Sequence, residues 1–120
     1  MYTSPSPMAC LFCEIVAGRS PARIVHQDEN VVAFHDIRPQ APTHLLLVPR
    51  RHLTSLLDLL PGDDSLAGAL VRVARDLAQK LGLAGRGFRL VFNCGEDAGY
   101  SVFHIHLHLL GGRPLGWPPG

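Results

Sequence analysis

The sequence has few cysteines, few aromatic or charged residues and no long apolar run. Only 3 of its 120 residues are cysteine, 7% are aromatic and 18% are charged. Three cysteines are too few for the disulfide framework of a small secreted domain, and no apolar run approaches the roughly 20 residues that span a bilayer. Residues 1–7 have neither the basic start nor the apolar stretch of a secretory signal. We therefore expect a cytoplasmic protein that does not associate with a membrane.

A basic cluster is also missing. Eleven lysines and arginines balance ten carboxylates to a formal net charge of +1, and no basic cluster is denser than Arg50-Arg51. Since nucleic-acid binding needs a basic patch, we expect no nucleic-acid partner. At 47% hydrophobic residues the chain can build one core but is too short for two. Residues 1–9, which lack periodicity, are predicted to be a disordered lead, and residues 10–120 a single domain.

The hydrophobic pattern predicts a mixed α+β fold. Apolar residues at helical spacing predict a short N-terminal helix over residues 11–16 and one long helix from Asp63 or Asp64 to about Leu81. Alternating or β-branched runs predict strands over residues 24–27, 31–36, 43–48, 88–93 and 102–109. We therefore expect a five-stranded antiparallel sheet with the long helix packed on it.

Three histidines alternate with apolar residues near the C-terminus. In a strand, His104, His106 and His108 would share one side, and the apolar residues between them would face the core. Neutral imidazole can transfer protons, attack phosphorus or bind metal; the alternative is chance histidines on a solvated strand. Alternate strand positions lie roughly 6.5 to 7 Å apart, which suits successive contacts to a phosphate better than chelation of one metal ion. Asn93, on the preceding strand, could add a neutral donor.

This segment resembles the His-x-His-x-His-x-x signature of the histidine triad family. Other motifs look like its branch of histidine triad nucleotide-binding proteins: Ala33-Phe34-His35-Asp36-Ile37, Pro39-Gln40-Ala41-Pro42-Thr43-His44, Pro49-Arg50-Arg51-His52 and Trp117-Pro118-Pro119-Gly120. The resemblance covers nearly the whole chain. It implies a hydrolase that cleaves purine nucleoside phosphoramidates or acyl-nucleotides through a covalent nucleotidyl-histidine and releases a nucleoside monophosphate.

The resemblance also assigns catalytic roles by position. His106 matches the histidine that attacks the α-phosphate, and His44 and His108 match histidines that line the phosphate site. Ser101 matches a serine near the leaving group. The preceding position is often glutamine in the family but is Tyr100 here. Its larger ring could narrow or reshape the leaving-group side of the site.

Substrate-binding residues follow in the same way. Asp36 matches a carboxylate that holds the ribose hydroxyls, a task suited to an ionised acceptor. The tail with Trp117 matches a segment that helps to select the acyl or amine part of the substrate. The purine cleft matches five apolar residues that composition alone would place in an ordinary core: Phe12, Ile15, Phe34, Ile37 and Leu46.

The spacing Cys10-x-x-Cys13 suits half of a zinc site, a reduced structural pair or a redox dithiol. The resemblance implies the other half, because His52 and His104 match histidines that join such a cysteine pair in many bacterial relatives. The Cys2His2 set would be a closed structural zinc site that pins the N-terminal helix to the sheet. It would take His104 out of catalysis, leave His106 free and supply no cofactor to the reaction.

The resemblance finally implies a homodimer with one continuous sheet and the long helices at the interface. The apolar stripe on the predicted long helix could form that contact or pack on the chain's own sheet: Leu66, Leu70, Val73 and Leu77.

Two alternatives to the hydrolase stay open. One is a nucleotide-binding or adaptor module with little turnover, and the other is a metalloenzyme that uses the three histidines as ligands.

Overall fold

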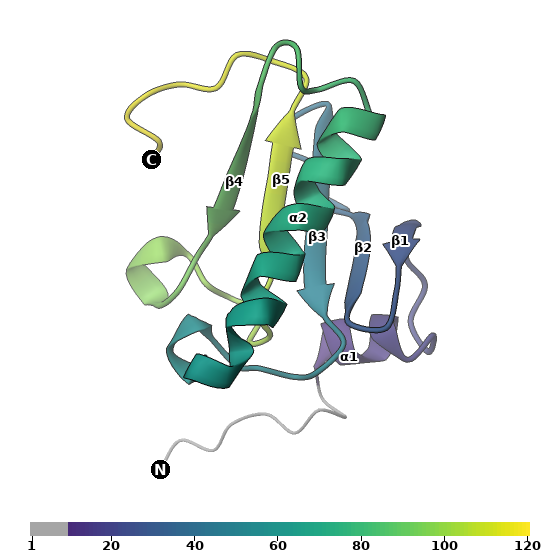
Figure 1. Cartoon of the computed structure of the whole chain (residues 1–120). Coiled ribbons are helices and arrows are strands. Elements are labelled where there is room, and N and C mark those ends of the chain that lie inside the picture. Colours follow the sequence, from purple (N-terminus) through teal and green to yellow (C-terminus); the bar gives the residue numbers. More distant parts are fainter. Residues whose placement is uncertain (1–9) are drawn as a thin grey trace.

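The structure is a computed structural model and describes residues 10–120. The predicted disordered lead, residues 1–9, lies outside the described residues. The chain forms one antiparallel sheet in the order β1-β2-β3-β5-β4. Figure 1 shows the long helix α2 lying across one face of this sheet. The predicted fold class, a five-stranded antiparallel sheet with one long and one short helix, is therefore confirmed.

The observed elements follow the hydrophobic pattern closely. The helices are α1 (Leu11–Val16) and α2 (Asp64–Lys80). The strands are β1 (Ile24–Gln27), β2 (Val31–His35), β3 (Thr43–Pro49), β4 (Phe88–Phe92) and β5 (Leu107–Gly111). Cys10 precedes α1 as its N-cap, and its Sγ accepts the backbone N–H of Cys13 at 3.4 Å. Both cysteines therefore meet at the first turn of α1. Within residues 10–120, no helix is both long enough and apolar enough to cross a membrane.

The sheet buries apolar side chains on both faces, because alternate residues of a strand point to opposite sides. One core joins α2 to strand residues that include Val31, Ala33, Leu45, Leu47, Leu107 and Leu109. The other joins Phe12 and Ile15 of α1 to Val32, Phe34, Leu46 and Val48. The two helices thus cover opposite faces, and β5 places His108 on the α1 face, opposite in parity to Leu107 and Leu109.

The apolar stripe of α2 packs mainly within the chain itself. Leu70, Val73 and Leu77 are buried against the sheet, whereas Leu66 is half-buried and Leu81 is 47% exposed. The helix ends one residue before Leu81, and Gly82 follows with a φ of +77°, a conformation that glycine adopts without strain.

The fifth strand begins later than predicted. The alternation predicted a strand over residues 102–109, but Ser101 to His106 is irregular and β5 begins at Leu107. In this irregular segment, the backbone N–H of Ile105 donates to the carbonyl of Leu53 at 2.8 Å, and His104 is completely buried. The alternation of histidine and apolar residues therefore does not mark a strand here. His104 is buried beside the cysteine pair, and Ile105 is buried in the core that includes α2. The prediction that His104 shares one strand face with His106 and His108 is wrong.

Candidate active site

A cleft of about 320 Å³ opens on the α1 face of the sheet, a volume suited to a small molecule. Its polar lining includes five of the predicted site residues: Asp36, Asn93, Ser101, His106 and His108. Its apolar lining includes all five predicted purine-cleft residues: Phe12, Ile15, Phe34, Ile37 and Leu46. Four of these five also belong to the α1-side core, and Ile37 is 89% exposed. The same apolar side chains therefore pack in the α1-side core and line the cleft.

Two predicted residues do not line this cleft. His44 is buried and contacts His108 from outside the cleft lining, and Trp117 is 83% exposed. Conversely, His35 and Arg38 line the cleft but carried no assigned role. His35 directly precedes Asp36 in the motif Ala33-Phe34-His35-Asp36-Ile37, and Arg38 directly follows that motif, so their closeness to Asp36 was the available signal. Leu11, Pro21, Ala22, Gly99 and Val102 complete the lining, and no sequence pattern distinguished them.

His106 presents an unprotonated nitrogen. Its Nδ1 lies 2.8 Å from the backbone oxygen of His104. A carbonyl oxygen only accepts, so Nδ1 carries the proton and Nε2 keeps its lone pair. Burial lowers the pKa of His106, which favours the neutral ring near pH 7. A neutral imidazole with a free nitrogen is the form that can act as a nucleophile.

A second series of hydrogen bonds fixes the proton positions on His44 and His108. The backbone N–H of Gln40 donates to Nδ1 of His44 at 3.0 Å, so the proton of His44 is on Nε2. This Nε2–H lies 2.9 Å from Nδ1 of His108 and 3.4 Å from Oδ2 of Asp36. His108 accepts at Nδ1, so its own proton is on Nε2.

The Nε2–H of His108 is left without a partner. Among residues 10–120 it is the buried side-chain polar atom for which no hydrogen bond is found. Burial, followed by the neighbouring His106 and His44, lowers the pKa of His108 to about 4, and burial also lowers the pKa of His44. Both rings are therefore neutral donors at pH 7. An unpaired buried donor is costly unless a ligand accepts from it, and His108 lines the cleft, where an anionic oxygen could do so.

Aromatic rings enclose His106. The ring of Tyr100 stacks on it, with centroids 5.6 Å apart and planes 13° apart, and Phe12 meets it edge-on at 5.1 Å. The Tyr100 hydroxyl donates to the backbone oxygen of Thr54. Tyr100 is 9% exposed and does not line the cleft. The ring lies against His106, and the expectation that it narrows or reshapes the leaving-group side stays a prediction.

The predicted zinc ligands converge on one point. Cys10, Cys13, His52 and His104 each offer a ligand atom, and these four atoms lie within 4.8 Å of one another. The measured pairs are Cys10 Sγ–His104 Nδ1 at 3.4 Å, Cys13 Sγ–His52 Nδ1 at 3.2 Å, Cys13 Sγ–His104 Nδ1 at 3.4 Å and His52 Nδ1–His104 Nδ1 at 3.1 Å. Tetrahedral zinc with about 2.3 Å to sulfur and about 2.0 to 2.1 Å to nitrogen separates such atoms by about 3.3 to 3.8 Å. These four separations lie within or slightly below the range expected for zinc.

The surroundings of this cluster also fit a cation. Nε2 of His104 donates to the carbonyl of Pro49 at 2.8 Å, and Nε2 of His52 lies 3.4 Å from the hydroxyl of Thr54. These partners turn the Nδ1 lone pairs toward each other, an arrangement that needs a cation or a proton between them. Burial lowers the pKa of His104 to about 4, and burial with the Cys10 hydrogen bond raises that of Cys13 to about 11. This Cys2His2 cluster could bind zinc, which would offset the cost of a buried thiolate.

The three histidines of the triplet do not form one ligand set. His104 faces the cysteine pair, whereas His106 and His108 face the cleft, and the groups of residues 10–120 that could hold a metal do not combine all three. Asp36, His44 and His108 do converge, but hydrogen bonds account for that approach. The geometry gives no support to a metalloenzyme built on the triplet.

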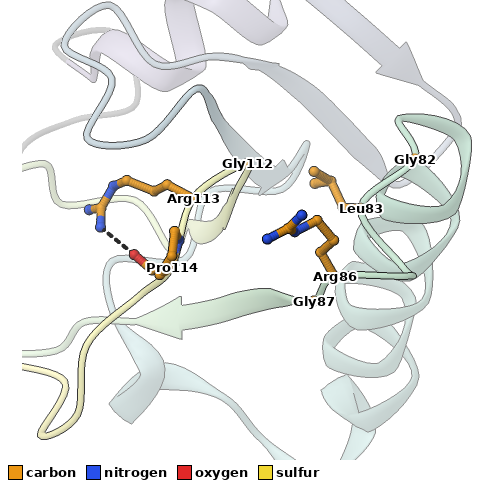
Figure 2. Close-up of a pocket in the computed structure, with 7 residues that line it drawn as sticks. All are labelled: Gly82, Leu83, Arg86, Gly87, Gly112, Arg113 and Pro114. Atoms are coloured by element: carbon orange, nitrogen blue, oxygen red, sulfur yellow. Dashed lines mark hydrogen bonds between the residues drawn. The ribbon is translucent and has the colours of Figure 1, made fainter.

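A separate hollow of about 430 Å³ lies between the end of α2 and the end of β5 (Figure 2). The guanidinium of Arg113 is turned away from it and donates to the backbone oxygens of Gln40 and Pro114. The remaining lining residues are Gly82, Leu83, Arg86, Gly87, Gly112 and Pro114. Arg86 alone offers a charge there, so this hollow lacks the converging groups that the histidine cleft has.

Comparisons with known proteins agree with this site. The HIT domain pattern matches residues 17–115. The purine nucleoside phosphoramidase of Escherichia coli K12 is 42% identical over 106 residues, which cover 88% of this chain and 89% of that protein. A HIT family hydrolase from Legionella pneumophila superposes with a TM-score of 0.91 at 51% identity, covering 92% of this chain and 99% of the other. A zinc-bound histidine triad family protein from Mycobacterium smegmatis gives 0.76 at 34% identity, covering 90% and 78%. The chain belongs to the HIT family and is a hydrolase homologous to these proteins.

Proposed function

We propose that the chain hydrolyses purine nucleoside phosphoramidates or acyl-nucleotides and releases a nucleoside monophosphate. The observation that carries this proposal is the unprotonated Nε2 of His106, a residue that lines the cleft and whose proton is held at Nδ1 by a backbone carbonyl. The E. coli relative, which carries the name of such an enzyme at 42% identity, supports the same substrate class.

The reaction would proceed in two displacements. The lone pair of His106 Nε2 attacks the α-phosphorus, the Nε2–P bond forms, and the bond to the leaving group breaks with its electron pair. An amine leaving group departs with a proton taken from water at the open end of the cleft, near the exposed Ser101. Water then attacks phosphorus and loses a proton, which replaces the one that the amine took from water. The electron pair of the Nε2–P bond returns to Nε2, and the monophosphate is released. Dividing one difficult displacement into two is the benefit of covalent catalysis.

The other predicted site residues would bind and orient the substrate. The unpaired Nε2–H of His108 would donate to a phosphate oxygen, and His44 would hold His108 in that tautomer. Asp36 would accept from the ribose hydroxyls. Asn93 and Ser101 would donate near the phosphate and the leaving group. The purine would lie against the apolar wall of Phe12, Ile15, Phe34, Ile37 and Leu46.

Three further expectations belong to this proposal. Zinc held by Cys10, Cys13, His52 and His104 would be structural, and the displacement itself would be carried by side chains. Residues 10–120 would act as one HIT domain. Two copies would pair into a homodimer with a continuous sheet. Trp117 is exposed and would be available to contact the second copy.

The test is intact-protein mass spectrometry after rapid mixing with adenosine 5′-phosphoramidate and acid quench. The wild-type protein is expected to gain one adenylyl group and His106→Gly none. In calorimetry the variant is expected still to bind adenosine monophosphate. Rapid turnover of wild type with neither adduct nor dependence on His106 would refute the covalent route. Binding by both proteins without any turnover would instead favour the adaptor module.

A further inference from the structure

We propose that Tyr100 is a positioning residue for His106, and that its ring stabilises the positive charge of the covalent intermediate. This inference rests on the proposed function. It begins from the place of Tyr100 in the structure, which is against the face of the His106 ring and outside the lining of the cleft.

The Tyr100 ring is fixed at several points. Its hydroxyl donates to the carbonyl of Thr54, and Phe103 meets its ring edge-on with centroids 5.7 Å apart. The residue is 9% exposed, so most of its ring is shielded from water. A ring held at its tip and along its side is a rigid platform. The near-parallel stacking on His106, with planes 13° apart, transmits that rigidity to the imidazole.

This contact completes the orientation of His106. The hydrogen bond from Nδ1 to the His104 carbonyl is one point of attachment and leaves the ring plane free to tilt. Phe12 meets the imidazole edge-on at 82°, and Tyr100 covers a face. Together the three contacts define the line along which the Nε2 lone pair points. A nucleophile must approach phosphorus along a narrow path, so this alignment affects the rate of attack directly.

The same contact acts on charge. His106 keeps its Nδ1 proton while Nε2 becomes bonded to phosphorus, so the imidazole ring carries a formal positive charge in the intermediate. The face of a tyrosine ring is electron-rich and attracts a cation placed over it, more strongly where water is excluded. No other aromatic ring among residues 10–120 is found stacked on His106 with its plane nearly parallel. Tyr100 therefore favours the intermediate over the free enzyme.

The test compares Tyr100→Leu and Tyr100→Phe with wild type in rapid-quench mass spectrometry, which follows both formation and loss of the adenylyl adduct. Tyr100→Leu removes the aromatic face and is expected to slow adduct formation about tenfold. The Kd for adenosine monophosphate, measured by calorimetry, is expected to stay within about twofold, because Tyr100 does not line the cleft. Tyr100→Phe keeps the ring and is expected to retain the rate within about threefold.

Phe103→Leu is the packing comparison, because it removes a ring that packs on Tyr100 and does not line the cleft. It is expected to slow adduct formation less than Tyr100→Leu does, since the Tyr100 ring itself remains against His106. If Phe103→Leu slows the reaction as much as Tyr100→Leu, the effect is general packing and the inference is refuted. Equal rates for wild type and Tyr100→Leu also refute it. If Tyr100→Leu does not fold, Tyr100→Gln, which lacks a ring, replaces it against Tyr100→Phe. Absence of any adduct or turnover in wild type would refute the proposed function itself.

Discussion

Burial keeps His44 and His108 neutral, with ring nitrogens 2.9 Å apart, and this makes the folded state sensitive to acid. The pKa of His108 falls from its ordinary value of 6.5 to about 4. At pH 7 the folded and unfolded states are both neutral at this residue. As the pH falls below 6.5 only the unfolded state takes up the proton, so the free energy of unfolding declines until both states are protonated near pH 4.

Urea unfolding of wild type and His108→Gln at pH 7, 5.5 and 4.5 measures this effect. The decline between pH 7 and 4.5 is expected to be smaller in the variant by the contribution of this one residue. Other buried groups, including His104, are present in both proteins and cancel in the comparison. Parallel declines would mean that His108 ionises normally in the folded protein.

Asp36 is expected to act on the sugar of the substrate. Its Oδ1 accepts the backbone N–H of Arg38 at 2.8 Å, which fixes the carboxylate at the cleft, and Oδ2 lies 3.4 Å from Nε2 of His44. Asp36→Asn is expected to raise the KM for adenosine phosphoramidate about tenfold, since a hydrogen bond to a charged acceptor is lost. With a 2′,3′-dideoxy substrate the same substitution is expected to change the KM little. An equal rise for both substrates would place the role of Asp36 elsewhere, in support of His44.

At the scale of elements, α1 has too few residues to be stable alone. It spans six residues, whereas isolated helices need about 12 to 15, so contacts to the sheet must hold it, and zinc bound by Cys10 and Cys13 would add to them. Cys13→Ser is expected to remove zinc, as measured by elemental analysis, and to lower the free energy of unfolding by about 2 kcal/mol or more. Amide hydrogen exchange is expected to rise first over α1.

Cys94→Ser is the control for this experiment, because Cys94 lies outside the Cys2His2 cluster. It is expected to keep one zinc per chain and near wild-type stability. Equal zinc content in Cys13→Ser and wild type would overturn the structural zinc site.

The element pattern was readable from sequence where one face of each element is buried. The first helix and first strand have the predicted bounds, and the second strand, third strand and long helix agree within one residue at most ends. The fifth strand differs, because His104, Ile105 and His106 are all buried without strand pairing. The alternation of histidine and apolar residues in the sequence cannot distinguish a strand from this irregular segment, since the histidines here are buried as well.

The sequence predicted which residues belong to the candidate site but not how they are arranged. The family motifs placed His106, His108 and Asp36 together, and all three line the cleft. The position of Tyr100 was not predictable, because its direction is set by the carbonyl of Thr54, 46 residues earlier in the chain. Contacts between distant backbone atoms leave no pattern in a single sequence.

At the scale of the whole molecule, β4 lies at one edge of the sheet and α2 exposes Val71 at 45%. An edge strand presents unpaired backbone groups that a second copy can pair with. Light scattering during gel filtration is expected to give twice the chain mass of 13.1 kDa. Val71→Glu is expected to shift the protein toward one chain mass on dilution.

Ile24→Glu provides the comparison for this substitution. Ile24 is 41% exposed on β1, at the opposite edge of the sheet, and the variant is expected to keep the wild-type mass. A wild-type protein of one chain mass at all concentrations would contradict the continuous sheet.

The proton positions on the cleft histidines are set by the main chain. A backbone N–H of Gln40 fixes His44, and a backbone carbonyl of His104 fixes His106. Point substitutions change side chains and leave these groups in place. Laboratory evolution by point mutation is therefore expected to alter which leaving groups the cleft accepts far more readily than which nitrogen attacks. Changing the attacking nitrogen would require insertions or deletions that move the backbone itself.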